Sequence, residues 1–415
     1  MLSRKYILIL IFISSLSAQN AMSAYGYGSY VESSDAASMS VSNKLLPSFK
    51  ENVSLTNPST WHNLLFTYLS TSVEAQNTKL QSSSSTNFSL SSINLVIPWK
   101  QKMSFGISFE PFLSREITVN DSTMSSFTFN DEELLYSRIN SSSGGPSVGK
   151  FSFGYKLNEL DSVGSSLGVV FGSSRSSRNL VINSENHLLQ SRDYFNGSSL
   201  NLFYSTTRFK INDKSFLLSV SYEHPLKSIN VKHDSYQAFL DLNDNNYHDV
   251  NDFPDVGQAL LPLSQKFEDE LKIQILNIGM DYEIKSREHL QIEFFNWVDN
   301  GNHNLDSSIF EGYIDKRNKI SVSYLRFAKP FSKNRYNLKS SLFLQNYGVK
   351  NLENINEFGL GLGVGINFGL TGNQIDFAYK VSSRKGLNIV DNEIVNMFNI
   401  GISIGDLWFV KRREI

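Results

Sequence analysis

A stretch rich in Asp and Asn near the middle of the chain has the clearest potential for binding chemistry. Oxygen-bearing groups fall at positions 1, 3, 5, 7, 9 and 12 of a loop, and they are Asp241, Asn243, Asn245, Tyr247, Asp249 and Asp252. Ca²⁺ binds roughly 6–8 oxygen ligands, and this spacing wraps a chain around one ion, with position 7 supplying a backbone carbonyl. The stretch therefore predicts a calcium site.

The loop departs from the usual calcium-binding pattern at two positions. It resembles a degenerate EF-hand-type or dockerin-type loop in which Asn246 replaces the usual Gly and Asp252 replaces the usual bidentate Glu. Asn tolerates the glycine position because it can adopt the left-handed backbone conformation. The alternative interpretation is a solvated acidic loop tip, and the sequence leaves both open.

Other reactive constellations are absent from the sequence. The chain has no Cys, which excludes disulfides, thiolate metal sites and a Cys nucleophile, and its 7 His residues show no metal-ligand spacing. Gly359, Gly361, Gly363 and Gly365 lie inside a predicted strand, whereas a nucleotide-binding loop must open a helix. We therefore predict that the protein is not an enzyme and that these glycines allow close approach of another segment or a ligand.

The amino terminus has the order of segments found in a secretory signal peptide. Arg4 and Lys5 precede an apolar run over residues 6–13, and small residues follow. We predict a signal peptide over residues 1–18, with Ser23 and Ala24 as alternative cleavage sites. No later run reaches the ~18 apolar residues of a transmembrane helix. A membrane-embedded protein would have to be a closed β-barrel, because lipid leaves no other way to pair the backbone groups.

From Trp61 onward, apolar and polar residues alternate with the period of a β-strand, most clearly over residues 358–369. About 14 such segments form hairpins, with short turns at one end and long polar loops at the other. We expect these loops over about residues 110–145, 175–197 and 225–268. A slip in the alternation between Ile275 and Ile278 predicts a bulge.

Strands of ~10 residues with one apolar face and unequal loops are typical of an outer-membrane protein. The sequence thus predicts an all-β fold, a transmembrane antiparallel β-barrel of about 14 strands. A soluble β-sandwich is the alternative, but its strands of ~5–6 residues would not need an apolar face on nearly every strand. The net charge of −2 gives no reason to expect a nucleic-acid partner.

The segment before the barrel carries a family resemblance. Ser34-Asp35-Ala36-Ala37-Ser38-Met39 and Asn57-Pro58-Ser59-Thr60-Trp61 resemble the hatch of the FadL family, outer-membrane transporters for long-chain fatty acids and other hydrophobic compounds, with Ser59 in place of the usual Ala. Ser143-Gly144-Gly145 and the phrase at residues 151–157 are similar to segments of bacterial relatives. The resemblance implies a hatch over residues 19–60 inside a barrel over residues 61–415, with Asn57 and Pro58 in the gate. The alternative is a disordered leader.

The resemblance also implies a function, which is passive uptake of fatty-acid-like hydrophobic small molecules through a hatch-gated channel in the bacterial outer membrane. Its partners would be the substrate and membrane lipid. One alternative is a structural or protein-secretion-associated barrel that binds a protein partner rather than a solute. Another is an outer-membrane enzyme, for which no motif is present in the sequence.

Overall fold

The computed structural model describes residues 20–32, 35–80, 83–129, 132–182, 185–211, 214–235, 238–243, 245, 248–254, 268–303, 312–329, 335–369, 372–387 and 392–406. The predicted signal peptide and Tyr247 lie outside the described residues.

Residues 20–64, here called the N-terminal segment, form four short elements: η1 (Ala21–Ala24), β1 (Ser29–Tyr30), α1 (Ala36–Val41) and η2 (Pro58–Asn63). The side chains of Asn20, Asp35 and Asn57 accept backbone N–H groups at the starts of the three helices, which is why the helices begin there. Trp61, where we expect the first strand, belongs to η2, because Asn57 and Pro58 start a helical turn. Among the described residues, no helix has both the length and the apolar composition needed to cross a bilayer.

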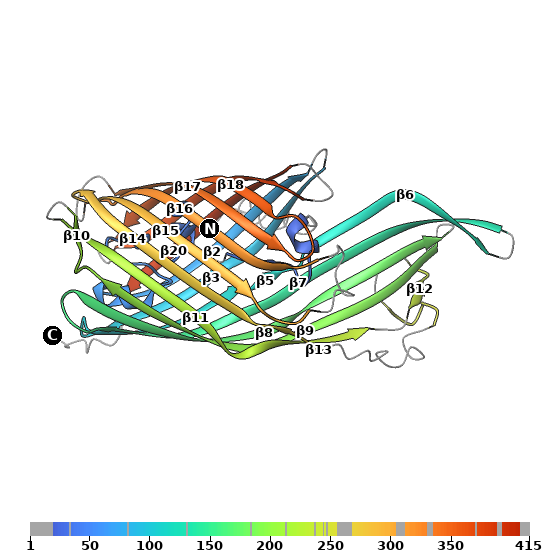
Figure 1. The fold of residues 1–415 in the computed structure, drawn as a ribbon, viewed down its shortest axis with the longest axis horizontal. Coiled ribbons are helices and arrows are strands. Elements are labelled where there is room, and N and C mark those ends of the chain that lie inside the picture. Colours follow the sequence, from blue (N-terminus) through green and yellow to red (C-terminus); the bar gives the residue numbers. More distant parts are fainter. Residues whose placement is uncertain are drawn as a thin grey trace, which may run out of the picture.

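Fourteen wall strands close into one antiparallel barrel, which confirms the predicted fold (Figure 1). They are β2 (Thr67–Leu80), β3 (Ser83–Trp99), β4 (Met103–Pro111) continued by β6 (Ile117–Phe129), β7 (Glu132–Lys156), β8 (Asp161–Ile182), β9 (Glu185–Thr206), β11 (Lys214–Ser235), β14 (Ile273–Lys285) preceded by β13 (Glu268–Leu271), β15 (Glu288–Asp299), β16 (Ile314–Arg326), β17 (Tyr336–Val349), β18 (Ile355–Phe368), β19 (Asn373–Lys385) and β20 (Glu393–Asp406). Three short strands complete the sheets: β5 (Leu113–Ser114), β10 (Lys210–Ile211) and β12 (Phe239–Asp241). The barrel closes where β20 pairs with β2.

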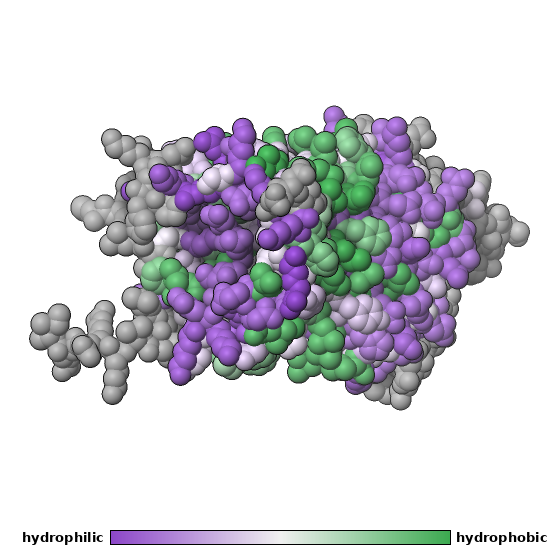
Figure 2. Space-filling model, turned by 60° about the vertical axis from the view of Figure 1, so that its left-hand side comes forward, coloured by the Kyte–Doolittle hydropathy of each residue, from purple (hydrophilic) through white to green (hydrophobic). Residues whose placement is uncertain are grey.

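The two faces of the wall have opposite character. Large apolar side chains such as Val322 and Phe398 are exposed on the outer face, whereas polar side chains such as Gln291, Lys319 and Ser321 are buried on the inner face. Figure 2 shows the hydrophobic residues gathered in a band across the middle of the visible face, with hydrophilic residues toward both ends. An apolar outside and a polar inside suit a barrel surrounded by lipid.

Several strands are much longer than a bilayer requires. β7 has 25 residues, and β8, β9 and β11 have 22 each, whereas roughly 9–11 residues span the membrane. The excess forms a sheet that extends from one end of the barrel (Figure 1). Much of the sequence that we expect to be loop at 110–145, 175–197 and 225–235 is therefore strand. The alternation fades there because neither face of a strand outside the bilayer has to be apolar.

The prediction of a bulge in β14 is wrong. The register of β14 with β11 and β15 continues without a shift through Ile275 and Ile278. Ile273 and Ile275 are instead buried on the inner face, and Ile278 is exposed on the outer face. The slip in the alternation therefore marks apolar residues that point into the barrel.

Candidate functional site

The N-terminal segment lies inside the barrel, and Asn57 is one of its contact points with the wall. Asn57 is fully buried, and its amide nitrogen donates to the Leu45 carbonyl at 2.9 Å and to Ser205 Oγ of β9 at 3.4 Å. The Ser59 hydroxyl adds a contact with Ser205 Oγ at 2.7 Å. The structure thus brings both predicted gate residues, Asn57 and Pro58, to the inner wall.

The close fit around Pro58 depends on two glycines of the wall. A Cβ added to Gly154 would lie 2.0 Å from the Pro58 carbonyl oxygen, and one added to Gly164 would lie 2.9 Å from Pro58 Cγ. Real Cβ atoms do not approach other atoms so closely, so η2 can sit here only because both wall residues lack a side chain.

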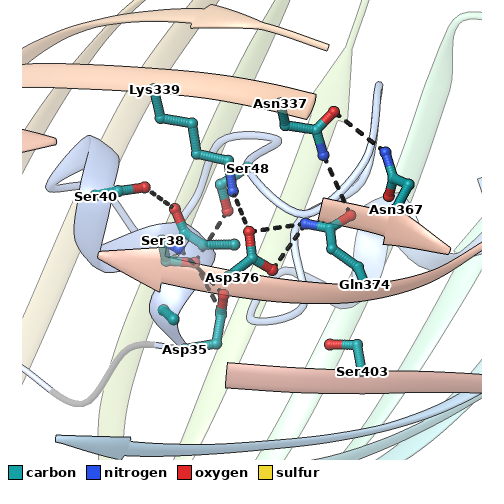
Figure 3. A network of polar contacts seen from close by, with 12 residues as sticks. Asp35, Ser38, Ser40, Ser48, Asn337, Lys339, Asn367, Gln374, Asp376 and Ser403 are labelled. Atoms are coloured by element: carbon teal, nitrogen blue, oxygen red, sulfur yellow. Dashed lines mark hydrogen bonds and ion pairs between the residues drawn. The ribbon is translucent and has the colours of Figure 1, made fainter. Parts of the chain in front are cut away.

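α1 occupies another part of the lumen, against β17, β18 and β19. Glycine again makes room, because a Cβ on Gly363 would lie 2.3 Å from Ser40 Cβ. Figure 3 shows the start of α1, with Asp35 and Ser38, beside polar side chains of β17 and β19. There Lys339 Nζ lies 2.9 Å from a carboxylate oxygen of Asp376. α1 therefore lies beside a part of the wall in which Lys339 and Asp376 pair with each other.

The wall is interrupted next to the N-terminal segment. β3 pairs with β4 only over residues 93–99, so within the described residues its part at 83–92 pairs with β2 alone. Beyond Pro111 the chain bends inward, and β5 pairs with β1 of the N-terminal segment. The bend requires Gly145, whose φ is +155° and whose Cβ would lie 2.1 Å from the Leu113 carbonyl oxygen.

Aromatic and aliphatic side chains gather inside the barrel at this bend. We call them the lumenal apolar cluster, and its buried members are Tyr27, Phe112, Leu113, Val148, Val170, Phe195, Ile229, Val231, Leu271, Ile273, Ile275, Phe295 and Trp297. Tyr30 packs against it, with its ring centre 5.9 Å from that of Trp297 and 5.5 Å from that of Phe112. No motif in the sequence predicts this cluster, and the slip in the alternation of β14 is the signal that could have indicated it. A lumen lined in this way can hold an apolar ligand.

Two groups of charged residues flank the cluster. Arg115, which follows β5, pairs with Asp193 of β9, and His233 Nδ1 lies 2.5 Å from the same carboxylate. Glu32 of the N-terminal segment meets basic residues of β16 and β19. One group joins the bend to the continuous wall, and the other joins the N-terminal segment to it. Neither group is visible as a motif in the sequence.

Two cavities border the N-terminal segment among the described residues. One cavity of about 60 Å³ lies between the N-terminal segment and the wall, where Tyr30, Leu55 and Trp61 face the Glu110–Lys150 ion pair. A second, of about 210 Å³, lies beside His62 and Glu159. The first holds a few water molecules at most.

The predicted calcium ligands that the structure describes lie close together on the extended sheet. Asn243 and Asn245 donate their amide groups to Asp249 Oδ2 at 2.9 and 2.8 Å, and Asp252 Oδ2 accepts the backbone N–H of Asp249 at 2.6 Å. The backbone N–H of Asn245 donates to Asp241. Among the described residues no three His, Asp or Glu side chains form a group that could hold a metal ion. Calcium binding therefore stays a prediction.

Three comparisons with known proteins bear on this architecture. The family model named BamG matches residues 1–414, whereas no curated protein is significantly similar in sequence. A FadL homologue from Pseudomonas aeruginosa has a TM-score of 0.57 at 11% identity, over 91% of this chain and 99% of that one. The CymD monoaromatic hydrocarbon channel has a TM-score of 0.53 at 11% identity, over 95% and 100% of the two chains. A deltaS2S3 mutant of the TodX monoaromatic hydrocarbon channel has a TM-score of 0.51 at 12% identity, over 91% and 100%.

At such low identities the likeness to the solved structures concerns the fold. It confirms an antiparallel barrel of FadL-type fold, and the family model supplies the membership by sequence. The chain belongs to the BamG family, and its barrel has the fold of the FadL-type channels.

Proposed function

We propose that the protein is a channel of the bacterial outer membrane that takes up hydrophobic small molecules by passive diffusion. The observation that carries this proposal is the lumenal apolar cluster at the interrupted part of the wall. Apolar side chains pointing into a barrel are costly to expose to lumenal water, and a hydrophobic ligand is the solute that would replace their present contacts. The likeness in fold to channels described as carrying monoaromatic hydrocarbons supports the same substrate class.

In this proposal the N-terminal segment is the hatch. Tyr27 and Tyr30 fill the apolar cluster in the described conformation, so a ligand that binds there displaces them. The lumen beyond the cluster is lined by small polar residues such as Ser152, Ser166 and Ser219. A hydrophobic solute would avoid that polar path and leave through the interrupted wall between β3 and the bend, directly into lipid. No step of this route needs a catalytic residue.

Uptake into proteoliposomes tests the proposal. The purified protein should give saturable flux of fatty acids or monoaromatic hydrocarbons, and no flux of a sugar of similar size. Phe195→Asp places a charge in the apolar cluster and should reduce the flux. Phe398→Tyr, on the outer face, is the control and should leave the flux unchanged. Absence of flux for every hydrophobic solute would reject the channel.

A second function is favoured by the extended sheet. Within the described residues β6 pairs only with β7, so its other edge offers unpaired backbone groups outside the barrel. Such an edge can accept a strand from another protein. A structural or secretion-associated barrel would therefore bind a protein partner there and show no solute flux, which the uptake assay separates from the channel.

A further inference from the structure

The outer face of the barrel changes character toward the end that carries the extended sheet. On β15, β16, β17 and β18 the apolar band ends at an exposed apolar residue, and the next outward residue of each strand is asparagine. These asparagines are Asn296, Asn318, Asn346 and Asn356. Asn296 and Asn346 donate their amide groups to the asparagine of the neighbouring strand at 2.6 and 2.8 Å. On these four strands the band is therefore bordered by neutral amides.

The strands of the extended sheet carry positive charge on the same outer face. Beyond the exposed Phe171, β8 presents Arg175, because side chains an even number of positions apart in a strand share a face. Arg175 lies directly opposite Arg192 of β9. β11 adds Lys227 and Lys232, whose partners on β9 share the face of Arg192. We call Arg175, Arg192, Lys227 and Lys232 the basic patch.

Contacts on this face orient Arg192. Its Nε and Nη2 atoms donate to Ser173 Oγ at 3.2 and 3.0 Å, and its guanidinium lies 4.9 Å from the centre of the Tyr194 ring. Lys232 Nζ lies 5.8 Å from the centre of the same ring. Two cations thus share one aromatic ring, and the N–H groups of Arg192 that Ser173 does not accept can donate to another acceptor.

The basic patch concentrates charge of one sign. Arg175 and Arg192 oppose each other on neighbouring strands, and like charges at directly opposed positions destabilise a sheet. Asp234, whose carboxylate oxygen lies 3.0 Å from Lys232 Nζ, offsets one of the charges. A bound anion would relieve the remaining repulsion. Phosphate suits this site, because a guanidinium group donates parallel hydrogen bonds to phosphate oxygens.

The position of the patch favours a lipid over a soluble anion. Val169 and Phe171 are exposed on β8, and Leu226 is exposed on β11, so apolar surface adjoins the basic residues on both strands. A lipid of the same leaflet can place its head group on the patch and its acyl chains against these residues. With the extended sheet outside the cell, that leaflet is the outer one, where phosphorylated glycolipids supply the head groups.

We propose that the basic patch binds the phosphate group of a glycolipid in the outer leaflet of the outer membrane, whose acyl chains lie along Val169, Phe171 and Leu226. The inference goes beyond the uptake of solutes, because it needs only the barrel in that membrane and the extended sheet outside the cell. The bound lipid holds the base of the extended sheet at the membrane surface. The strands bordered by asparagine do not select a phosphorylated lipid, since their amides carry no charge.

Native mass spectrometry of the purified protein in an uncharged detergent tests the site, with lipid A as the probe. The wild type should bind lipid A more tightly than the same lipid after enzymatic removal of its phosphate groups. The Arg175→Gln, Arg192→Gln double variant should weaken binding of lipid A about tenfold, because each basic residue near a head group adds to the attraction. Its binding of the dephosphorylated lipid should be unchanged. The matched control, Lys316→Gln, Lys385→Gln, removes the same charge from exposed positions of β16 and β19 and should change neither affinity.

The other outcomes would overturn the inference. They are equal affinity of the wild type for the two lipids, or equal behaviour of the double variant and its control. If the double variant does not fold, Lys227→Gln, Lys232→Gln takes its place with the same expected loss.

Two further probes identify the kind of anion. Glucosamine phosphate has the phosphate group without acyl chains and should bind far more weakly than lipid A; equally tight binding would make the patch a site for soluble phosphates. Phosphatidylglycerol should also bind more weakly, and equal binding would reject a preference for the glycolipid. None of these measurements needs solute flux, so their failure is distinct from failure of the proposed channel.

Discussion

Gly154 of β7 and Gly164 of β8 are direct partners in the sheet, and both lie against Pro58. Two neighbouring strands thus leave out a side chain at the same level of the wall, and the resulting gap is filled by the N-terminal segment. The contact ties the conformation at the start of η2 to the barrel.

Gly154→Ala should displace η2 from its contact with the wall. The added Cβ would lie 2.0 Å from the Pro58 carbonyl oxygen, and overpacking of this kind costs about 1–3 kcal/mol. We expect a lower temperature of unfolding and more frequent channel openings in planar bilayers. Gly149→Ala is the matched control on the same strand, because its Cβ would meet only Phe171 at 3.7 Å. Equal behaviour of the two variants would mean that Pro58 does not rest on Gly154.

Deleting residues 25–54 should open the lumen. The deletion removes Tyr27, Tyr30, Glu32 and α1, so the lumen loses the groups that fill it in the described conformation. We expect a larger and less selective conductance in planar bilayers, together with a barrel that still shows heat-modifiable migration. An unchanged conductance would show that the segment does not gate the channel.

Gly145→Ala should straighten the wall at the bend. The φ of +155° is unfavourable for Ala, and the new Cβ would collide with the Leu113 carbonyl, so β5 could no longer pair with β1. We expect reduced uptake of hydrophobic solutes with an intact barrel, measured in proteoliposomes beside Gly149→Ala. Wild-type uptake in Gly145→Ala would argue against an exit at the bend.

Calcium should bind the loop at residues 241–252 with modest affinity. The backbone N–H of Asn251, helped by the Asn243 and Asn245 amides, lowers the pKa of Asp249, so this carboxylate is ionised at neutral pH. Both amides now donate nitrogen to Asp249 and would have to turn to offer oxygen. Extracellular calcium modules bind at roughly 10⁻⁴–10⁻³ M.

Calorimetric titration checks the calcium prediction. The Asp241→Ala, Asp249→Ala double variant should lose the binding heat, and Glu159→Ala, an exposed carboxylate at the other end of the barrel, should keep it. Identical titrations for the wild type and the double variant would leave a solvated acidic loop.

The extended sheet should lie outside the cell. A Cys at Ser235, at the end of β11, should react with an impermeant maleimide added to intact cells. A Cys at Glu159, in the short turn between β7 and β8, should react only after the outer membrane is opened. The reverse labelling pattern would invert the orientation.

The barrel could be predicted from the sequence because its cause is local. A strand in lipid must present an apolar residue at every second position, so alternation such as that of residues 358–369 predicts both the strand and its outer face. The helical turn at Asn57 and Pro58 also has a local cause, a cap and a proline, although the alternation from Trp61 onward predicted a strand there. Where the lipid ends, this constraint ends, and the extensions of β7, β8 and β9 beyond the bilayer could not be distinguished from loops.

The candidate site was decided by the tertiary structure. Glu32 and Arg317 are 285 positions apart in the chain, and no pattern near either residue indicates the other. Lumen-facing residues follow no common pattern of polarity or size, because each side chain has to fit the groups that the closed barrel places opposite it. In the sequence, Ile273 and Ile275 indicate only a slip in the alternation of a strand. In the fold they belong to the lumenal apolar cluster with Phe112, and Tyr30 packs against that cluster. The sequence determines that a barrel forms, and closure of the barrel around its own N-terminal segment determines what that barrel can bind.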